Sequence, residues 1–311
     1  MVSSDSILVY SVPWDVTVTY RSGSFKSPGF IQSAMTQLDE VHPFSTKRFD
    51  LSFLPVNSQI LDLQDQYKPS SSSIISTLNH GTPLNPRQLS ALKDINIASN
   101  QLNDIVFSDV QKYASNPLVL LGGEHGVGVG YLRSLSSQYD HFSVLQIDAH
   151  MDCRVKYFGY EFSHASVMTH YASHAAVTGI TQVGIRDYAI EETQFQTDSD
   201  TSFYVFDDYK MHKELFQGRA WHAICSDILA TLSDRVFISL DVDGLMTYLC
   251  QSTGTPVPGG LSYNQLVYLL ELVSTNKTII GSELVEVHAS SSEDWNAAVG
   301  ARLLYLLAGG V

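Results

Sequence analysis

The sequence contains few basic residues and no long hydrophobic run. Its 18 Lys and Arg residues stand against 32 Asp and Glu, which gives a formal net charge of −14. Nucleic acid is therefore a poor partner, because binding to phosphates normally needs a cluster of basic side chains. No apolar run approaches the roughly 18–20 residues that span a bilayer, so we expect no membrane insertion. The acidic balance suits a cationic ligand, metallic or organic, although it is also common among ordinary soluble enzymes.

Cysteines are few, and the N-terminus has no basic leader. The odd number and wide spacing of Cys153, Cys225 and Cys250 indicate reduced thiols rather than a disulfide framework, and none has zinc-finger spacing. The segment MVSSDSILVYSVPWD has an apolar run that is too short for a signal peptide. It predicts a first strand and, by default, a cytoplasmic location.

Short runs rich in Val, Ile, Leu and Phe alternate with longer helix-like stretches, which predicts a mainly parallel α/β sheet of about eight strands in one domain. The runs begin at Ser6, Ser58, Pro117, Phe142, Ile180, Ser202, Arg235 and Thr278. Helices are predicted over Pro86–Tyr113, Gly126–Ser137, His164–Thr178, His222–Leu232, Ser262–Ser274 and Asp294–Leu307. The patch SSSS at Ser70–Ser73 is typical of a loop.

Polar residues collect where four of these strands end. GGEHG follows LVLL, DAHMD follows VLQI, DVDG follows FISL, and Glu286 ends SELVE. Ligands of open α/β sheets bind outside the carboxyl ends of the strands. We therefore expect the four segments to meet at one edge of the sheet.

Ionisable side chains alternate within two of these segments, DAHMD and DVD. Side chains two apart in an extended segment share a face, and several carboxylates crowded near a buried sheet edge need compensating cations. Mixed carboxylate and imidazole ligands point to Mn²⁺ or a neighbouring transition metal. Two such ions about 3.5–4 Å apart lower the pKa of a shared water, so hydrolysis is the expected reaction. The predicted ligands are His125, Asp148, His150, Asp152, Asp241 and Asp243.

Each of these residues taken singly also has a structural interpretation. A lone Asp at a strand end is commonly a turn former or a helix cap, and a lone His is commonly a core or surface residue. GGEH is also compatible with a tight turn that enters a helix. A nucleotide-binding loop has only GEHGVGVG in its favour, and these glycines do not form G-x-G-x-x-G.

The motifs resemble those of the ureohydrolases, the family of arginases, agmatinases and formimidoylglutamases. LLGGEHG resembles the family's GGDHS, DAHMD its DAHxD, and SLDVDG its SxDxD. TGTPVPGGLS, ELVEV and the N-terminal SVPWDVTVTYRSGSFKSPGFI resemble further family segments, whereas residues 40–111 match only loosely. The resemblance implies a three-layer, doubly wound α/β fold with eight mostly parallel strands, helices on both faces and a single domain over residues 1–311.

Carried onto this sequence, the resemblance implies two Mn²⁺ ions per chain, bridged by Asp148 and Asp241. The first ion would be held by His125, Asp148, Asp152 and Asp241. The second would be held by Asp148, His150, Asp241 and Asp243. Members of the family usually assemble as trimers or hexamers, so we expect a homo-oligomer.

Two further residues match catalytic positions of the family. His164 in FSHASVM matches the His that carries protons near the leaving amine, and Glu286 matches the carboxylate that pairs with the guanidinium. A guanidinium needs an anion that accepts paired hydrogen bonds, and an imidazole suits proton transfer near neutral pH. Without the resemblance, a surface strand position is the favoured interpretation of Glu286 and a helix start is the favoured interpretation of His164.

The sequence departs from the family pattern at several positions. Glu124 and Glu283 stand where Asp is usual, and Gly126 stands where Ser is usual. Met246 and Thr247 replace an Asp-Pro pair. Longer acids alter the hydrogen bonds around metal ligands, so these changes bear on catalysis more than on metal binding.

The segment CRVKYFGYEFSHAS and the following QVGIRD resemble agmatinases most, which makes agmatine the leading substrate and putrescine and urea its products. Arg154 and Lys156 would repel an amine if they pointed into the pocket and would then favour a carboxylate-tailed substrate. Formimidoylglutamase, arginase and guanidinobutyrase activities therefore stay as alternatives. A metal-binding but non-catalytic homologue that acts as a scaffold is the alternative outside the enzymes.

Overall fold

Eight strands form one sheet in the computed structural model, which describes residues 6–39, 41–44 and 50–310. The strands are β1 (Ile7–Val12), β2 (Leu51–Phe53), β3 (Leu118–Gly122), β4 (Phe142–Ile147), β5 (Val177–Ile185), β6 (Ser202–Asp207), β7 (Arg235–Asp241) and β8 (Thr278–Val285). Their order is β2-β1-β3-β8-β7-β4-β5-β6, and every neighbouring pair is parallel. The expected parallel α/β sheet is confirmed.

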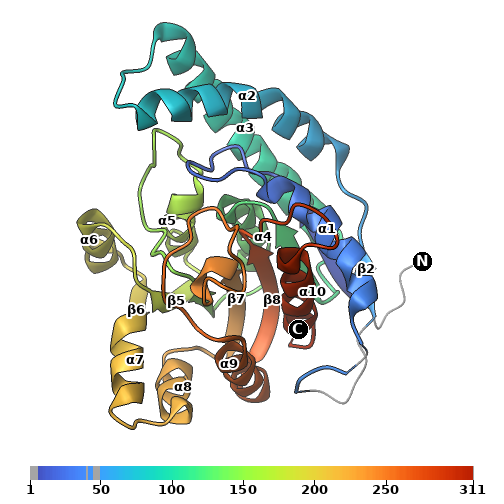
Figure 1. The fold of residues 1–311 in the computed structure, drawn as a ribbon, viewed down its shortest axis with the longest axis vertical. Helices are drawn as coiled ribbons and strands as arrows, with labels where there is room; N and C mark the ends of the chain where they lie inside the picture. Colours follow the sequence, from blue (N-terminus) through green and yellow to red (C-terminus); the bar gives the residue numbers. More distant parts are fainter. Residues whose placement is uncertain (1–5, 40, 45–49, 311) are drawn as a thin grey trace.

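Helices pack on both faces of the sheet (Figure 1). They are α1 (Ser27–Ala34), α2 (Ser58–Asn79), α3 (Pro86–Gln111), α4 (Val129–Ser136), α5 (Val167–Ala172), α6 (Ile190–Asp198), α7 (Asp208–Phe216), α8 (Trp221–Ala230), α9 (Tyr263–Asn276) and α10 (Trp295–Ala308). Residues of α1, α8, α9 and α10 bury one face of the strands, and residues of α2 to α5 bury the other. Among the helices that the structure describes, none is both long and apolar enough to cross a bilayer.

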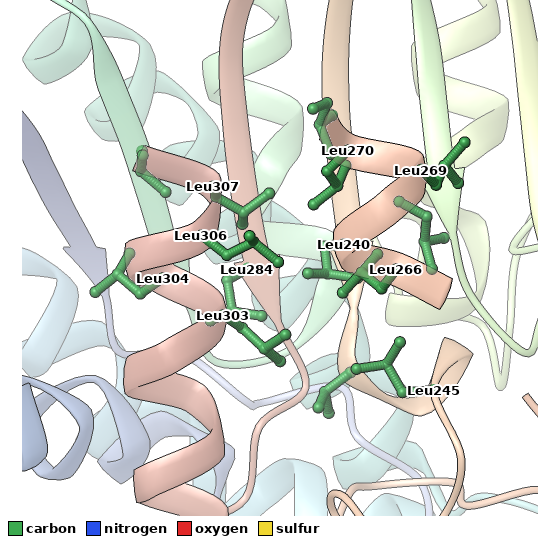
Figure 2. Packing of buried hydrophobic residues seen from close by; sticks show 14 of the residues in the cluster. Leu240, Leu245, Leu266, Leu269, Leu270, Leu284, Leu303, Leu304, Leu306 and Leu307 are labelled. Atoms are coloured by element: carbon green, nitrogen blue, oxygen red, sulfur yellow. The ribbon is translucent and has the colours of Figure 1, made fainter. Parts of the chain in front are cut away.

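Leucines pack α9 and α10 against the middle of the sheet, as Figure 2 shows. Leu240 of β7 and Leu284 of β8 are fully buried beneath Leu266 of α9 and Leu303 of α10. Burial of one such side chain contributes about 1.5–3 kcal/mol. Because Leu240 directly precedes Asp241, this packing fixes the strand end from which a predicted ligand projects.

The strand predicted from Ser58 is wrong, because this segment is the first turn of α2. The side chain of Asn57 caps the helix by accepting a hydrogen bond from Gln59 N. Buried residues then recur at helical spacing, including Ile60, Leu63, Ile74 and Ile75. Six residues were too few to distinguish the period of a helix from that of a strand. The second strand is instead the short β2.

Two other local predictions also need correction. Ser70–Ser73 is not a loop, because it continues α2, where the buried Ser71 hydroxyl lies 2.7 Å from the Tyr160 hydroxyl. The predicted helix over His164–Thr178 is too long. It consists of a 3₁₀ turn, η4 (His164–Ser166), and α5, and the chain enters β5 at Val177.

Candidate metal centre

Four central strands carry the predicted site residues at their carboxyl ends. His125 opens a 3₁₀ turn after β3, Asp148 directly follows β4, Asp241 ends β7, and Glu286 directly follows β8. These strands are consecutive in the sheet, in the order β3-β8-β7-β4. The expected meeting of distant segments at one edge is confirmed.

One group of ligating atoms surrounds the imidazole of His125. Its Nδ1 lies 2.9 Å from Asp152 Oδ2, 3.2 Å from Asp148 Oδ2 and 3.6 Å from Asp241 Oδ2. All four residues are buried. Nδ1 nevertheless has no hydrogen-bond partner of acceptable geometry among the described residues. The group combines an unpartnered imidazole nitrogen with three carboxylate oxygens, which is a donor set suited to a divalent transition metal.

A second group lies closer to solvent. His150 Nδ1 is 3.2 Å from Asp243 Oδ2 and 3.6 Å from Asp148 Oδ1. The ligating atoms of these three residues lie within 4.8 Å of one another, and so do those of His125, Asp148 and Asp241. Asp148 therefore belongs to both groups. The side chain of His150 is 21% exposed, whereas that of His125 is fully buried.

The buried carboxylates shift one another's pKa. Burial, with the charge of Asp148 second, raises the pKa of Asp152 to about 7. Burial and the neighbouring carboxylates Asp243 and Asp148 raise the pKa of Asp241 well above its usual range. Burial also raises the pKa of Asp148, but the neighbouring imidazoles of His125 and His150 outweigh it and lower that pKa. Ionising the whole cluster is thus costly unless positive charge enters it.

The hydrogen bond at Nε2 of His125 determines which ring nitrogen carries the proton. His125 Nε2 lies 2.7 Å from Ser239 Oγ, and Ser239 in turn donates to Glu283 Oε1, also over 2.7 Å. Because the serine hydroxyl gives its proton to Glu283, it accepts one from His125 Nε2. Nδ1 then carries the lone pair that faces the carboxylates, as a metal ligand requires. Tyr171 also donates to Glu283 Oε1 and holds it in place.

Glu286 and Asp152 adopt the left-handed backbone conformation that non-glycine residues rarely take, with φ of 59° and 52°. Glu286 Oε1 accepts a hydrogen bond from His125 N over 2.9 Å, and Glu286 N donates to Gly123 O. A Cβ at Gly254 would approach Glu286 Oε2 to 2.9 Å, so the glycine leaves room for this carboxylate. Backbone strain of this kind concentrates at functional sites.

A cavity of about 350 Å³ opens onto the cluster. Its wall includes ligand candidates from both groups together with the two predicted catalytic residues, His164 and Glu286. Burial lowers the pKa of His164 to about 3, so its imidazole is neutral at pH 7. All eight residues singled out from the sequence thus lie in or around one site.

The departures from the family pattern leave this geometry intact. Glu124 is fully buried and accepts a hydrogen bond from Thr17 N at Oε2, and burial raises its pKa to about 8. Met246 N donates to Leu261 O, and the Thr247 hydroxyl donates to Val257 O. These contacts tie the loop after Asp243 to residues 257–261, so the replacements lie outside the ligand cluster.

Sequence reasoning named Glu283 as a departure from the family pattern but missed the row of polar side chains to which it belongs, below the ligands. The strand registers place Glu283, Ser239, Gln146 and Gln182 side by side across four neighbouring strands. All four are fully buried. The signal was present, because each is a polar residue within a mostly apolar strand segment: GSELV, FISL, FSVLQI and ITQVGI. A buried polar residue needs partners, and here two of the four bond directly to ligand candidates, Ser239 to His125 and Gln146 to Asp148.

Known proteins resemble this chain over different lengths. The N(1)-aminopropylagmatine ureohydrolase of Thermus thermophilus is 36% identical over 170 residues, which is 55% of this chain and only 54% of that protein. The agmatinase of Pyrococcus horikoshii is 24% identical over 307 residues, or 97% of this chain and 90% of the relative. The solved structure of arginase from Medicago truncatula superposes with a TM-score of 0.70 at 18% identity, over 97% of this chain and 86% of that one.

The likeness to the Medicago truncatula arginase, at 18% identity, bears on the fold alone. It agrees with the eight-stranded sheet described above. The sequence profile of the arginase family matches residues 5–309, nearly the full length of the chain. The chain therefore belongs to the arginase family.

Proposed function

We propose that the protein is a binuclear manganese hydrolase that cleaves a guanidino compound, with agmatine as its substrate and putrescine and urea as its products. The observation that carries the proposal is the unpartnered Nδ1 of the buried His125, which faces three carboxylates. Within the described part of the chain, only histidines form ion pairs with the four clustered aspartates. Neutral imidazoles leave the negative charge of this cluster unbalanced, and bound cations would supply the missing positive charge.

The ligand residues divide between the two ions. His125, Asp148, Asp152 and Asp241 would hold the buried ion. Asp148, His150, Asp241 and Asp243 would hold the ion nearer the cavity. Divalent ions in such a site would lower the pKa of water and so supply a nucleophile near neutral pH.

The protein's own residues orient the substrate and move protons. Glu286 lines the cavity and accepts hydrogen bonds from the guanidinium, which places the carbon of that group above the cluster. The reaction forms a bond between this carbon and the oxygen of water, and it breaks the bond to the chain nitrogen. Both hydrogens of the water end on that leaving nitrogen. His164, neutral before reaction, accepts a proton and passes it to the departing amine.

The charges at the cavity favour a cationic tail. Lys156 pairs with Glu161 over 2.6 Å and is absent from the cavity wall. Arg154 lines the cavity, but it pairs with Glu191 over 2.7 Å and its guanidinium lies 4.9 Å from the centre of the Tyr157 ring. Asp187 also lines the cavity and forms no ion pair with any described residue. Neither basic residue therefore supplies a free charge for a carboxylate tail, and Asp187 is available to an amine.

A substrate panel tests the proposal. Protein loaded with Mn²⁺ is incubated with agmatine, arginine and guanidinobutyrate, with urea as the readout, and with formiminoglutamate, with formamide as the readout. We expect the highest kcat/KM for agmatine. Formamide release from formiminoglutamate with no urea from agmatine would reject the lead and support formimidoylglutamase.

A longer substrate is the second candidate. The Thermus relative is named for N(1)-aminopropylagmatine, which carries an additional amine beyond that of agmatine. The cavity wall includes Asp187 and also Glu192, whose two oxygens already accept hydrogen bonds from Cys153 N and Ala189 N. Aminopropylagmatine therefore joins the panel, and a kcat/KM above that of agmatine would move the assignment to it.

One variant distinguishes the proposed hydrolase from a metal-binding homologue without catalytic activity. His164→Ala removes the proton carrier without touching a predicted ligand, so it should retain two Mn²⁺ ions and lose turnover. Wild-type protein that binds Mn²⁺ and turns over none of the panel would instead support a scaffold. A homo-oligomer of three or six chains and a cytoplasmic location stay predictions, which sedimentation and cell fractionation check.

A further inference from the structure

Three glutamines connect helix α6 to Asp148, the aspartate shared by both ligand groups. Gln146 lies in β4, Gln182 lies opposite it in β5, and Gln196 lies on α6. Gln196 Nε2 donates to Gln182 Oε1 over 2.5 Å, and Gln182 Nε2 donates to Gln146 Oε1 over 2.6 Å. Gln146 Nε2 then donates to Asp148 Oδ2 over 2.8 Å. In this glutamine series every amide donates toward the carboxylate.

The remaining contacts allow only this direction. The second hydrogen on Gln146 Nε2 goes to His150 O at 3.2 Å, and the second on Gln182 Nε2 goes to Met151 O at 2.8 Å. If either amide were turned around, its oxygen would face these carbonyl oxygens. Gln146 and Gln182 are fully buried, so water does not replace a lost partner.

The hydrogen bond from Gln146 completes the support of Asp148. Its Oδ1 accepts a hydrogen bond from His150 N over 2.7 Å, and its Oδ2 accepts the one from Gln146. Each oxygen thus has one protein donor and keeps a further lone pair, Oδ2 on the side of His125 and Oδ1 on the side of His150. A carboxylate that serves two groups at once needs both oxygens held in this way.

We propose that the glutamine series is a positioning device for Asp148 and that Gln196, outside the sheet, is the donor with which the series begins. The inference rests on the proposed function, in which Asp148 is a ligand of both ions. Hydrogen-bond partners of a metal ligand fix its orientation, and their loss costs roughly 10–100-fold in metal affinity. Gln196 is a positioning residue, because it reaches Asp148 only through the two buried glutamines.

Helix α6 also contributes to the cavity. Glu192, one turn before Gln196, lines the cavity and accepts hydrogen bonds from Cys153 N and Ala189 N. The same short helix thus supports the cavity wall and the shared ligand. A change in the position of α6 would therefore alter both the cavity wall and the hydrogen bonds that hold Asp148.

Gln196→Glu tests the direction of the series. A carboxylate at this position cannot donate, so it accepts from Gln182 instead and turns that amide around. Gln146 must then turn too, which presents its oxygen to Asp148. We expect the Mn²⁺ dissociation constants, measured by titration calorimetry on metal-free protein, to rise about tenfold. Circular dichroism checks that the fold is retained.

Gln194→Glu is the matched control. It adds the same charge to the same helix, but Gln194 bonds only to the exposed Asp198 among the described residues. Its Mn²⁺ affinity should equal that of the wild type. Gln146→Leu, which removes the last donor without adding charge, should weaken binding by more than Gln196→Glu does.

The outcomes separate this inference from the proposed function. A wild-type protein that binds no Mn²⁺ overturns both. A wild-type protein that binds two ions, with unchanged affinity in Gln196→Glu and Gln146→Leu, overturns the inference alone. Equal weakening by Gln194→Glu and Gln196→Glu also overturns it, because charge on α6 would then explain the effect.

Discussion

Two sets of buried carboxylates lie close together at the carboxyl edge of the sheet, and they are neutralised in different ways. Asp15, in the loop after β1, is fully buried and has its own cation, because Lys68 Nζ lies 2.9 Å from its Oδ1. Gln64, Gly23 and Ser22 supply three further donors. The second set is Asp148, Asp152, Asp241 and Asp243, which share two imidazoles and, within the described residues, pair with no Lys or Arg.

The difference shows which carboxylates belong to the fold and which are kept for a ligand. Around Asp15 the protein supplies every compensating group, so nothing is left for an ion to do. Around Asp241 it supplies one backbone donor, Asp243 N at 2.8 Å, and its pKa is raised by burial and by its neighbours. A buried site with excess negative charge either keeps some of its acids protonated or binds cations, which restore the ionised form.

The largest effect is expected at Asp148, the ligand that the two groups share. Asp148→Asn removes one negative charge from both groups, so we expect loss of both Mn²⁺ ions. Turnover should fall by more than the roughly 100-fold upper cost of losing a mere hydrogen-bond partner of a ligand. Elemental analysis and urea release measure the two effects. The control is Asp109→Asn, which is the same chemical change far from the site and should keep both ions. If Asp148→Asn also retained two ions, the assignment of Asp148 as a ligand would be wrong.

The next largest effect is expected on the stability of the fold, at the ion pair between Lys68 and Asp15. Lys68→Met leaves the buried Asp15 without its partner, and we expect the free energy of unfolding to fall by about 3 kcal/mol. Chemical denaturation measures it, and added Mn²⁺ should restore none of the difference, because Lys68 balances a charge outside the metal cluster. Lys112→Met, which removes an exposed partner of Asp109, serves as the control and should change stability little. Equal losses in the two variants would refute the distinction.

A smaller effect, on Mn²⁺ affinity, is expected from Ser239 in the row of buried polar side chains below the ligands. Ser239→Ala takes away the acceptor of His125 Nε2, so the ring loses its fixed orientation. We expect Mn²⁺ affinity of the buried ion to weaken about 10–100-fold while the second ion changes less. The control is Ser282→Ala in the adjacent strand, since that hydroxyl is also buried but has no hydrogen-bond partner among the described residues. Unaltered affinity in Ser239→Ala would remove this serine from the support of the site.

The smallest effect concerns a carboxylate that is satisfied by hydrogen bonds far from the site. Burial raises the pKa of Asp109, but hydrogen bonds from Asn57, Lys112 and Tyr10 outweigh it and lower that pKa. The resulting stabilisation is present at neutral pH and is lost as the pH falls through the lowered pKa, because the folded state favours the carboxylate. Tyr10→Phe should cost about 1 kcal/mol at pH 7.

Denaturation of Tyr10→Phe at several pH values is the measurement. Its difference from the wild type should narrow in acid, and Mn²⁺ affinity should stay unchanged. A difference that grows as the pH falls would show that the sign of the shift at Asp109 is wrong.

Local sequence patterns predicted most of the fold and the six proposed ligands, whereas His164 and Glu286 came from the resemblance to the family. The run at Ser6 and the six runs after Ser58 all form strands. Six of these strands are mostly buried, as expected for apolar runs in a parallel sheet covered on both faces, whereas β6 is an edge strand with no buried residue. The ligand segments were recognisable because alternate ionisable residues at the end of a buried apolar strand are costly unless a cation balances them. The errors fell on Ser58 and Ser70–Ser73, where tertiary contacts of Ile60, Ser71 and Ile74 stabilise a helix through a weak local pattern.

By itself, the sequence determined the chemistry available at the strand ends, since residue type and alternation need no knowledge of distant segments. Only the tertiary structure decided which acid receives a cation of its own. Lys68 reaches Asp15 from 53 positions away, and the glutamine series joins residues on two strands and a helix. Such pairings depend on strand order, register and helix placement, which arise from packing of the whole chain and leave no trace in a short window of sequence.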